Sequence, residues 1–300
     1  MSNWGKNIQG VRTAAREDEA MHTSREAVAG TGLLVAAIRA RESQRADRLF
    51  TDPFAEKLAG EAGIRLLDAA IAASGEHSTV QIAVRTRFWD EALLDAAATV
   101  GQVVILAAGM DSRAYRLDWR DGVTVFELDQ PAVIEAKNRL LADDVPRSRR
   151  VAVGVDLAED WPSALTAAGF DEGAPSVWLI EGLLQYLDEG EVGALFARVD
   201  ALSAPGSVLL YEVVGQTLLD SPMMAGLLES MAAQGSPWLF GSDTPGELAE
   251  RHGWMAVVTD IAVPGNEWNR WFTPAVPMEV PGVPRGYFVV AVKRSRQNGQ

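Results

Sequence analysis

Short apolar runs separated by helix-like segments begin near residue 102, and this alternation constrains the fold more than any other feature of the sequence. The run at 103–106 (VVIL) is too short for a helix and rich in β-branched residues, which is typical of a buried strand. Similar runs recur at residues 123–126, 150–155, 176–180, 207–213, 254–261 and 286–293. Helical patterns at 131–141 and 188–202 separate several of them. The alternation predicts right-handed crossovers, a mostly parallel sheet and an α/β fold.

The first hundred residues are predicted to be helical. The sequence TSRE at 23–26 fits a capping box, and a stretch rich in Ala, Leu and Val follows it to about residue 40. Asp52 and Pro53 are typical of a second helix start, because a carboxylate caps the first turn and proline needs no N–H there. A third helix is expected from about residue 79 to residue 98.

The segment from residue 215 to about residue 248 interrupts the strand pattern. It has little strand character and contains Met223, Met224, Met231, Trp238 and Phe240. A lid over a binding site and ordinary helical packing are equally good interpretations of this composition. We therefore expect one domain over residues 1–300, with a helical cover at 1–100, a ligand-binding core at 101–214, a lid-like insertion at 215–250 and closing strands at 251–300.

The charge balance argues against a nucleic-acid partner. The chain has 41 acidic and 27 basic residues, a net charge of -14, and an anionic polymer would be repelled without a local basic patch. Arg147, Arg149 and Arg150 form the tightest basic cluster, and acids flank it. We expect this cluster to be a solvated loop.

Composition also narrows the chemistry and the location. The absence of cysteine excludes disulfides, zinc–thiolate sites and a cysteine nucleophile. The three histidines, at positions 22, 77 and 252, share no metal-ligand spacing, so no metal is expected. The first residues lack a signal-peptide pattern, and no apolar run reaches the ~18–20 residues of a membrane helix. The sequence therefore predicts a cytoplasmic protein that does not enter the membrane.

Acidic residues follow four successive predicted strands. They are Asp111, Glu127 with Asp129, Asp156 and Glu181, and Tyr186 lies a little beyond the last of them. In an open parallel sheet the carboxyl ends of the strands meet at the ligand site. Any one of these acids could be a helix cap, Asp111 and Asp156 in particular, but capping explains a row of four less easily.

The row of acids favours a ligand without phosphate. A dinucleotide pyrophosphate requires a glycine-rich loop, but only Gly109 of the G-x-G-x-x-G pattern is present, and Asp111 would repel a phosphate there. S-adenosylmethionine carries a sulfonium and an ammonium group instead, which suit an acidic rim. Asp129 or Glu127 would accept hydrogen bonds from its ribose hydroxyls.

The carboxylate of such a ligand requires a cation, for which arginine offers a bidentate fork. Arg85 and Arg87 lie on the helix that precedes the first strand, and one of them is expected to be an ordinary surface residue. Arg113 and Arg116 follow the glycine loop, where pairing with the acids is their alternative role.

Several motifs together resemble those of the leucine carboxyl methyltransferase family. They are TDPFA (51–55), VRTRFWD (84–90), ILAAGMDSRAYRL (105–117), FELDQP (126–131), VGVDL (153–157) and LIEGLLQYL (179–187). The resemblance runs from about residue 25 to residue 214, continues at 285–288, and is nearest to a largely actinobacterial subgroup of S-adenosylmethionine-dependent methyltransferases.

The resemblance implies a Rossmann-like class I methyltransferase sheet and a set of cofactor-binding residues. It gives Arg85 as the clamp on the cofactor carboxylate, Ala108, Gly109 and Asp111 as the loop under the methionine portion, Asp129 as the ribose ligand, Asp156 and Leu157 as the adenine contacts, and Glu181 and Tyr186 as the residues near the sulfonium and the acceptor. Arg39 or Arg41 would replace a lysine that eukaryotic members use to bind the cofactor.

The expected activity is S-adenosylmethionine-dependent O-methylation of a carboxylate or hydroxyl on a small molecule. A carboxylate needs no general base, whereas a hydroxyl needs one, for which Glu181 or a mobile histidine is the candidate. Arg87 and Arg285 are candidate cations for an anionic acceptor. The alternatives are a non-catalytic S-adenosylmethionine-binding protein and a nicotinamide-dependent oxidoreductase, which the missing glycines disfavour.

Overall fold

The computed structural model describes residues 30–294, except for the side chains of residues 77 and 78. Its core is a seven-stranded sheet in the order β3-β2-β1-β4-β5-β7-β6. The strands are β1 (Gln102–Leu106), β2 (Thr124–Asp129), β3 (Arg149–Gly154), β4 (Ser176–Ile180), β5 (Val208–Val214), β6 (Trp254–Asp260) and β7 (Gly286–Lys293). β1 to β5 pair in parallel, whereas β7 is antiparallel to both of its neighbours. The predicted Rossmann-like α/β fold is thus confirmed.

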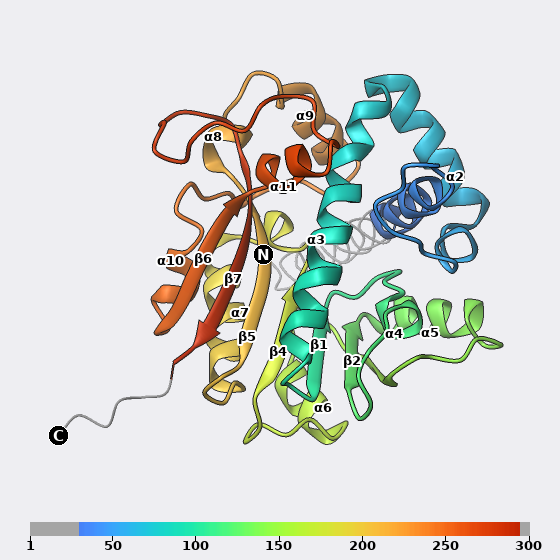
Figure 1. The fold of residues 1–300 in the computed structure, drawn as a ribbon, viewed down its shortest axis with the longest axis vertical. Helices are drawn as coiled ribbons and strands as arrows, with labels where there is room; N and C mark the ends of the chain where they lie inside the picture. The colour runs from blue at the N-terminus through green and yellow to red at the C-terminus, as the bar shows by residue number, and fades with distance from the viewer. Residues whose placement is uncertain (1–29, 295–300) are drawn as a thin grey trace, which may run out of the picture.

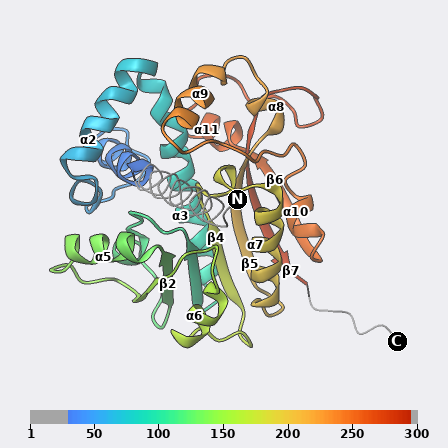
Figure 2. The same ribbon diagram turned by 180° about the vertical axis from the view of Figure 1, so that it is seen from behind.

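Helices cover both faces of this sheet and one of its ends. They are a helix over residues 30–43, α2 (Ala55–Ser74), α3 (Val80–Ala97), α4 (Arg113–Arg116), α5 (Pro131–Leu140), α6 (Trp161–Ala167), α7 (Glu189–Ala201), α8 (Gln216–Leu219), α9 (Ala225–Ala233), α10 (Glu247–Glu250) and α11 (Ala262–Glu267). α3 crosses one face, and α6, α7 and α10 lie over the other (Figures 1 and 2). α8, α9 and α11 gather beyond one end of the sheet, on the other side of α3 from α2 (Figure 1).

The period of two along each strand divides the core into two layers. In β1, Val103 and Ile105 belong to the apolar cluster that contains α3, while Val104 and Leu106 belong to the cluster that contains α6 and α7. Because both faces are covered, the central strands are apolar throughout, which is why they appear in the sequence as continuous runs.

Most predicted elements lie within a few residues of the observed ones, and the differences are at their ends. α2 begins at Ala55 with Phe54 as its N-cap, not at Asp52. The Asp52 carboxylate does accept a hydrogen bond from the Phe54 backbone N–H, but it is also bound by more distant partners. α7 begins with the Asp188–Glu191 capping box. The capping box predicted at 23–26 lies outside the described residues.

The prediction that Arg147, Arg149 and Arg150 form a solvated loop was wrong for Arg150, whereas Arg149 is exposed but lies in a strand. Arg149 and Arg150 lie in β3, and the Arg150 side chain is only 9% exposed because it pairs with the buried Glu127 carboxylate. Arg147 is exposed and pairs with Asp118. The local charge pattern could not reveal this, because Glu127 comes from the neighbouring strand.

The insertion at 215–250 contains the short helices α8, α9 and α10. Among the residues that the structure describes, no helix is both long and apolar enough to cross a membrane. Within the same residues, no group of three or more histidine or acidic side chains is arranged to hold a metal ion.

Candidate active site

A cavity of about 1430 Å³ opens at the carboxyl ends of the parallel strands. Its walls come from five parts of the chain: the strand ends, α3 with the helix at 30–43, α7, the insertion, and the segment between β6 and β7. Pockets for small ligands usually measure about 300–1,000 Å³. The cavity therefore has room for two small molecules side by side.

The loop after β1 forms the floor of the cavity through an unusual backbone. Ala107 has φ 52° and Gly109 has φ 45°, and Ala107 is one of only two non-glycine residues with positive φ among those described. The Ala108 N–H donates to Leu128 O at 3.0 Å, which fastens the loop to β2. A strained conformation of this kind is often found at functional sites, where surrounding contacts enforce it.

Asp129 and Glu127 have different surroundings, although they lie two residues apart on β2. The Asp129 carboxylate lines the cavity and accepts the Gly109 N–H at 2.6 Å. Glu127 is fully buried outside the cavity, where it pairs with Lys137 and Arg150 at 2.8 Å each. Of the two candidate ribose ligands, only Asp129 therefore lies in the cavity.

Two of the strand-end acids cap the turns that follow them, although the N-caps of the nearby helices α4 and α6 are Ser112 and Asp160. Asp111 accepts the backbone N–H of Arg113 at 2.6 Å, and Asp156 accepts that of Ala158 at 2.9 Å. Both nevertheless line the cavity, as does Leu157. Capping holds each loop in place and does not exclude contact with a ligand.

Arg85 reaches the carboxyl ends of β4 and β5 from α3. Its guanidinium pairs with Glu181 Oε1 at 2.8 Å and with Glu212 Oε1 at 2.8 Å. The Gly182 N–H donates to the same Glu212 oxygen at 2.7 Å. Gly182 has φ 67°, a backbone conformation that favours glycine, and it brings the turn into ordinary contact with Arg85.

Arg113 connects three carboxylates within the same wall. Its side chain is 3% exposed, and it pairs with Asp90 at 2.7 Å, with Glu181 at 2.7 Å and with Asp111. The alternative role of Arg113, pairing with the acids, is therefore the one that the structure shows. Arg116 has the same role, because it holds Asp90 through two hydrogen bonds.

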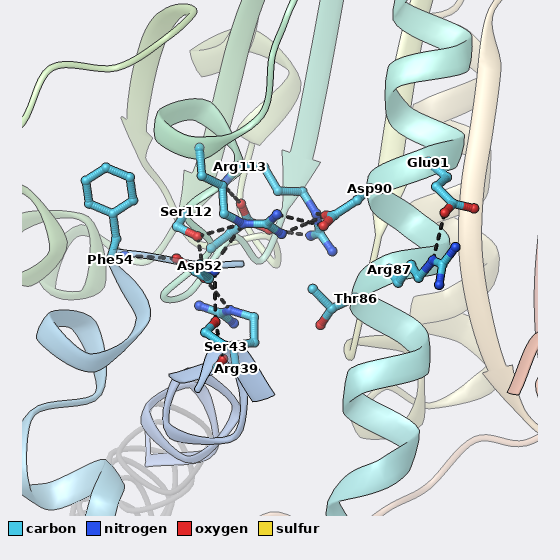
Figure 3. A network of polar contacts seen from close by, with 12 residues as sticks. Arg39, Ser43, Asp52, Phe54, Thr86, Arg87, Asp90, Glu91, Ser112 and Arg113 are labelled. Atoms are coloured by element: carbon cyan, nitrogen blue, oxygen red, sulfur yellow. Dashed lines mark hydrogen bonds and ion pairs between the residues drawn. The ribbon is translucent and has the colours of Figure 1, made fainter. Parts of the chain in front are cut away.

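The network of charged and polar side chains continues from Arg116 to the helix at 30–43. Arg116 donates to Ser112 Oγ, which donates to Asp52 Oδ2 at 2.6 Å. Arg39 pairs with the same Asp52 oxygen at 2.9 Å and also donates to Met110 O in the cavity floor. Figure 3 shows Arg39, Asp52, Ser112, Arg113 and Asp90 as one connected group between the helical cover and α3. The cover is thus fastened directly to the glycine loop.

The remaining candidate cations fall into two groups. Arg87 pairs with Glu91 at 2.8 Å, on the opposite side of α3 from Asp90 and Arg113 (Figure 3). Arg41 pairs with exposed Glu76. Neither lines the cavity, whereas Arg39 does. Arg285 lines it too, but its guanidinium is bound by Asp260.

Burial and neighbouring charges perturb the ionisation of these groups. Burial by itself would raise the pKa of Asp111, but the charges of Arg113, Lys137 and Arg39 together outweigh it and lower the pKa to about 2. Glu181 behaves likewise, because Arg113 and Arg85 together outweigh its burial and lower its pKa. Burial dominates at Asp129 and at Glu212, and the pKa of each is raised.

Three acids of the site were not singled out from the sequence. Glu212 is on β5 and Asp260 ends β6, so extending the row of strand-end acids to two further strands would have found both. Asp90 is the last residue of the VRTRFWD motif, in which only the arginines were considered. Its partners Arg113 and Arg116 follow more than 20 residues later.

A sulfonium nucleoside fits the residues that are present. The cavity offers the carboxylates of Asp129 and Asp156 on separate strand ends and an arginine on α3. A Cβ placed on Gly109 would have only one neighbouring atom within 4 Å, Ala107 O at 4.0 Å. The backbone of the loop is therefore open to close approach. No glycine triplet is present to bind a pyrophosphate.

Comparisons with known proteins agree with this fit. A Mycobacterium bovis protein is 42% identical over 273 residues, 83% of this chain and 82% of its own, and bears the provisional name S-adenosyl-L-methionine-dependent methyltransferase. A Mycobacteroides abscessus protein of the same name is 39% identical over 78% of this chain and 86% of its own. A crystal structure from Thermobifida fusca, provisionally titled a methyltransferase, has a TM-score of 0.53 at 19% identity, covering 79% of this chain and 90% of its own. A DUF574 family protein from Streptomyces avermitilis has a TM-score of 0.57 at 14% identity, covering 86% and 96%.

The fold and the cavity define an S-adenosylmethionine-dependent methyltransferase, an enzyme with S-adenosylmethionine as its cofactor. The sequence model of the leucine carboxyl methyltransferase family matches residues 32–200, and the chain belongs to this family. Family membership decides against the nicotinamide-dependent oxidoreductase.

Proposed function

We propose that this enzyme transfers the methyl group of S-adenosylmethionine to an oxygen of a small molecule, with a carboxylate favoured over a hydroxyl. The observation that carries the proposal is the cavity at the strand ends, in which carboxylates from several strands lie beside paired arginines. Bound S-adenosylmethionine supplies an electrophilic methyl group, and the protein supplies binding and orientation.

Each cofactor-binding residue has a defined part in this proposal. Asp129, whose carboxylate already accepts the backbone N–H groups of Gly109 and Gln130, accepts hydrogen bonds from the ribose hydroxyls. Asp156 and Leu157 contact adenine, while Ala108, Gly109 and Asp111 lie under the methionine portion. Arg85 binds the cofactor carboxylate, for which it exchanges one of its two present carboxylate partners.

The surroundings of Glu181 favour an acceptor that is already anionic. Its carboxylate pairs with Arg85 and Arg113, and its lowered pKa makes it a weak base. A hydroxyl acceptor would have to lose its proton to such a base, whereas a carboxylate has no proton to lose. We therefore assign Glu181 to holding both arginines. Tyr186 lines the same cavity, and we assign it to orienting the acceptor.

Calorimetric titration with S-adenosylmethionine, S-adenosylhomocysteine and NADH tests the cofactor. We expect binding of the first two and none of NADH, and binding of NADH alone would overturn the proposal. Incubation with metabolite extracts and S-adenosylmethionine tests turnover, with an expected product gain of about 14 Da, one CH₂ net. A methyl ester is hydrolysed by mild alkali and a methyl ether is not, so an alkali-stable product would exclude the carboxylate. A protein that binds cofactor but never turns it over would be the non-catalytic alternative. The predicted cytoplasmic location stays a prediction.

A further inference from the structure

The part of the cavity farthest from β1 and β2 has an apolar wall. Six residues represent it: Met223, Leu227, Trp238 and Leu239 from the insertion, and Phe272 and Val276 from the segment before β7. The proposed cofactor contacts Asp129, Asp156 and Gly109 come instead from the loops after β1, β2 and β3. The cavity therefore has a polar end and an apolar end.

The apolar wall is exposed to an unusual degree. Met223 is 79% exposed, Phe272 is 63% and Leu239 is 58%, and all three line the same cavity. Single exposed apolar residues are common, but several that line one concave site mark a surface that binds an apolar partner. The excess volume of the cavity over that of an ordinary small-ligand pocket provides the space for this partner.

Polar and ring contacts behind the wall hold the parts around Val276 and Leu239 in place. Arg285 donates to the carbonyls of Val276 and Pro277 at 2.7 Å each, while Asp260 neutralises its charge. The Leu239 N–H donates to Gln185 O at 2.6 Å. The rings of Trp238 and Tyr186 pack edge to face, with their centroids 6.5 Å apart. A preformed wall loses little conformational entropy when it binds.

The cations of the cavity are already engaged. Among the described residues that line it, the arginines are Arg39, Arg85, Arg113, Arg198 and Arg285, and each donates to a carboxylate or a backbone carbonyl. The proposed cofactor carboxylate takes the place of one partner at Arg85, so an acceptor with several anionic groups would have to displace further ion pairs or hydrogen bonds. A ligand with one carboxylate requires only the positive charge of the sulfonium.

We propose that the acceptor is a monocarboxylic acid with an extended apolar body, and that the apolar wall binds this body. The inference rests on the proposed function and adds the substrate class to it. One carboxylate oxygen forms the new bond to the methyl carbon, and the carbon–sulfur bond breaks with its electron pair left on sulfur. The products are a methyl ester and S-adenosylhomocysteine, and no proton is transferred.

Titration with butanoate, octanoate and dodecanoate, each below its micelle concentration, tests the wall. The affinity is expected to rise about fourfold with each added methylene until the wall is covered. Each titration is run with and without saturating S-adenosylhomocysteine. Equal affinities along the series would overturn the inference. Failure of S-adenosylhomocysteine to bind would instead overturn the proposed cofactor site, and the chain-length series without it would still report on the wall.

Leu227→Gln locates the binding. This residue is 46% exposed in the cavity, and we expect the variant to bind dodecanoate about tenfold more weakly with unchanged affinity for S-adenosylhomocysteine. Leu66→Gln is the matched control, because Leu66 is 42% exposed on α2 and does not line the cavity. Equal losses in both variants, or no loss in Leu227→Gln, would overturn the assignment. Tighter binding of a leucine-terminated tripeptide than of octanoate would show that the wall serves a peptide instead.

Discussion

The two ends of the cavity are built on different principles. The polar end consists of short loops that directly follow parallel strands, and buried ion pairs such as Arg113 with Glu181 hold it together. The apolar end consists of side chains such as Met223 and Phe272 that few protein atoms cover. The first end is stabilised by its own contacts, whereas the second leaves apolar surface for a partner to cover.

This difference separates stability from specificity. Substitution at the polar end removes charge partners that the folded protein already has, so it should cost stability or cofactor affinity. Substitution at the apolar wall removes little that the protein itself uses, so its effect should appear only with the acceptor. The predictions below test this division, beginning with the largest expected effect.

Arg113→Met should cause the largest loss of stability. Its guanidinium joins Asp90, Asp111 and Glu181 while 3% exposed, so its removal leaves buried carboxylates without a partner. We expect the free energy of unfolding in urea to fall by about 3–5 kcal/mol. Arg65→Met is the control, because Arg65 is 70% exposed and its pairing with Glu61 should contribute less than about 0.5 kcal/mol. Equal stability of both variants would contradict the central role of Arg113.

Asp129→Ala should weaken the binding of S-adenosylhomocysteine about ten- to hundredfold in calorimetry, because hydrogen bonds to a charged group are lost. The fold should persist, as circular dichroism can show. Asp118→Ala serves as the control, because Asp118 is exposed and lies outside the cavity. A variant that binds as tightly as the wild type would remove Asp129 from the ribose site.

Asp111 should make stability depend on pH in the acid range. A carboxyl with a folded pKa below its unfolded pKa stabilises fully above the unfolded value, and that stabilisation is lost as the pH falls through the folded value. The pKa of Asp111 is lowered from 3.8 to about 2. The stability advantage of the wild type over Asp111→Asn should therefore shrink by about 2 kcal/mol between about pH 5 and pH 2.

Asp129→Asn should show the opposite sign in the same titration. Burial raises the pKa of Asp129, so the native state binds the proton of this carboxyl more tightly than the unfolded chain does. The contribution of Asp129 to stability therefore falls as the pH rises above the ordinary pKa of an aspartate. Denaturation curves over the acid range would measure both slopes. Parallel slopes for the two variants would refute the contrast between their surroundings.

Met223→Gln should have the smallest effect on stability. The side chain is 79% exposed, so the free energy of unfolding should change by less than about 0.5 kcal/mol. A loss as large as that from Arg113→Met would show that the apolar wall is part of the folding core and would remove the basis for an apolar acceptor.

The sequence by itself determined the strands, the boundaries of α3, α5 and α7, and the acids at the polar end of the cavity. These features depend on signals that span only a few residues: the apolar run at 103–106, the capping box of Asp188 and Glu191, and an acid directly after a strand. Because the carboxyl ends of parallel strands meet at one edge, a row of acids in the sequence becomes one site in space.

Only the tertiary structure decided which side chains share that site. It placed Arg85 and not Arg87 in the cavity, committed Arg285 to Asp260, and buried Glu127 against Arg150 and Lys137. The apolar wall likewise joins the insertion to the segment before β7. The partners Arg85 and Glu212 are 127 residues apart, and such a pairing depends on how the helices and strands pack together. No local pattern in the sequence records that packing.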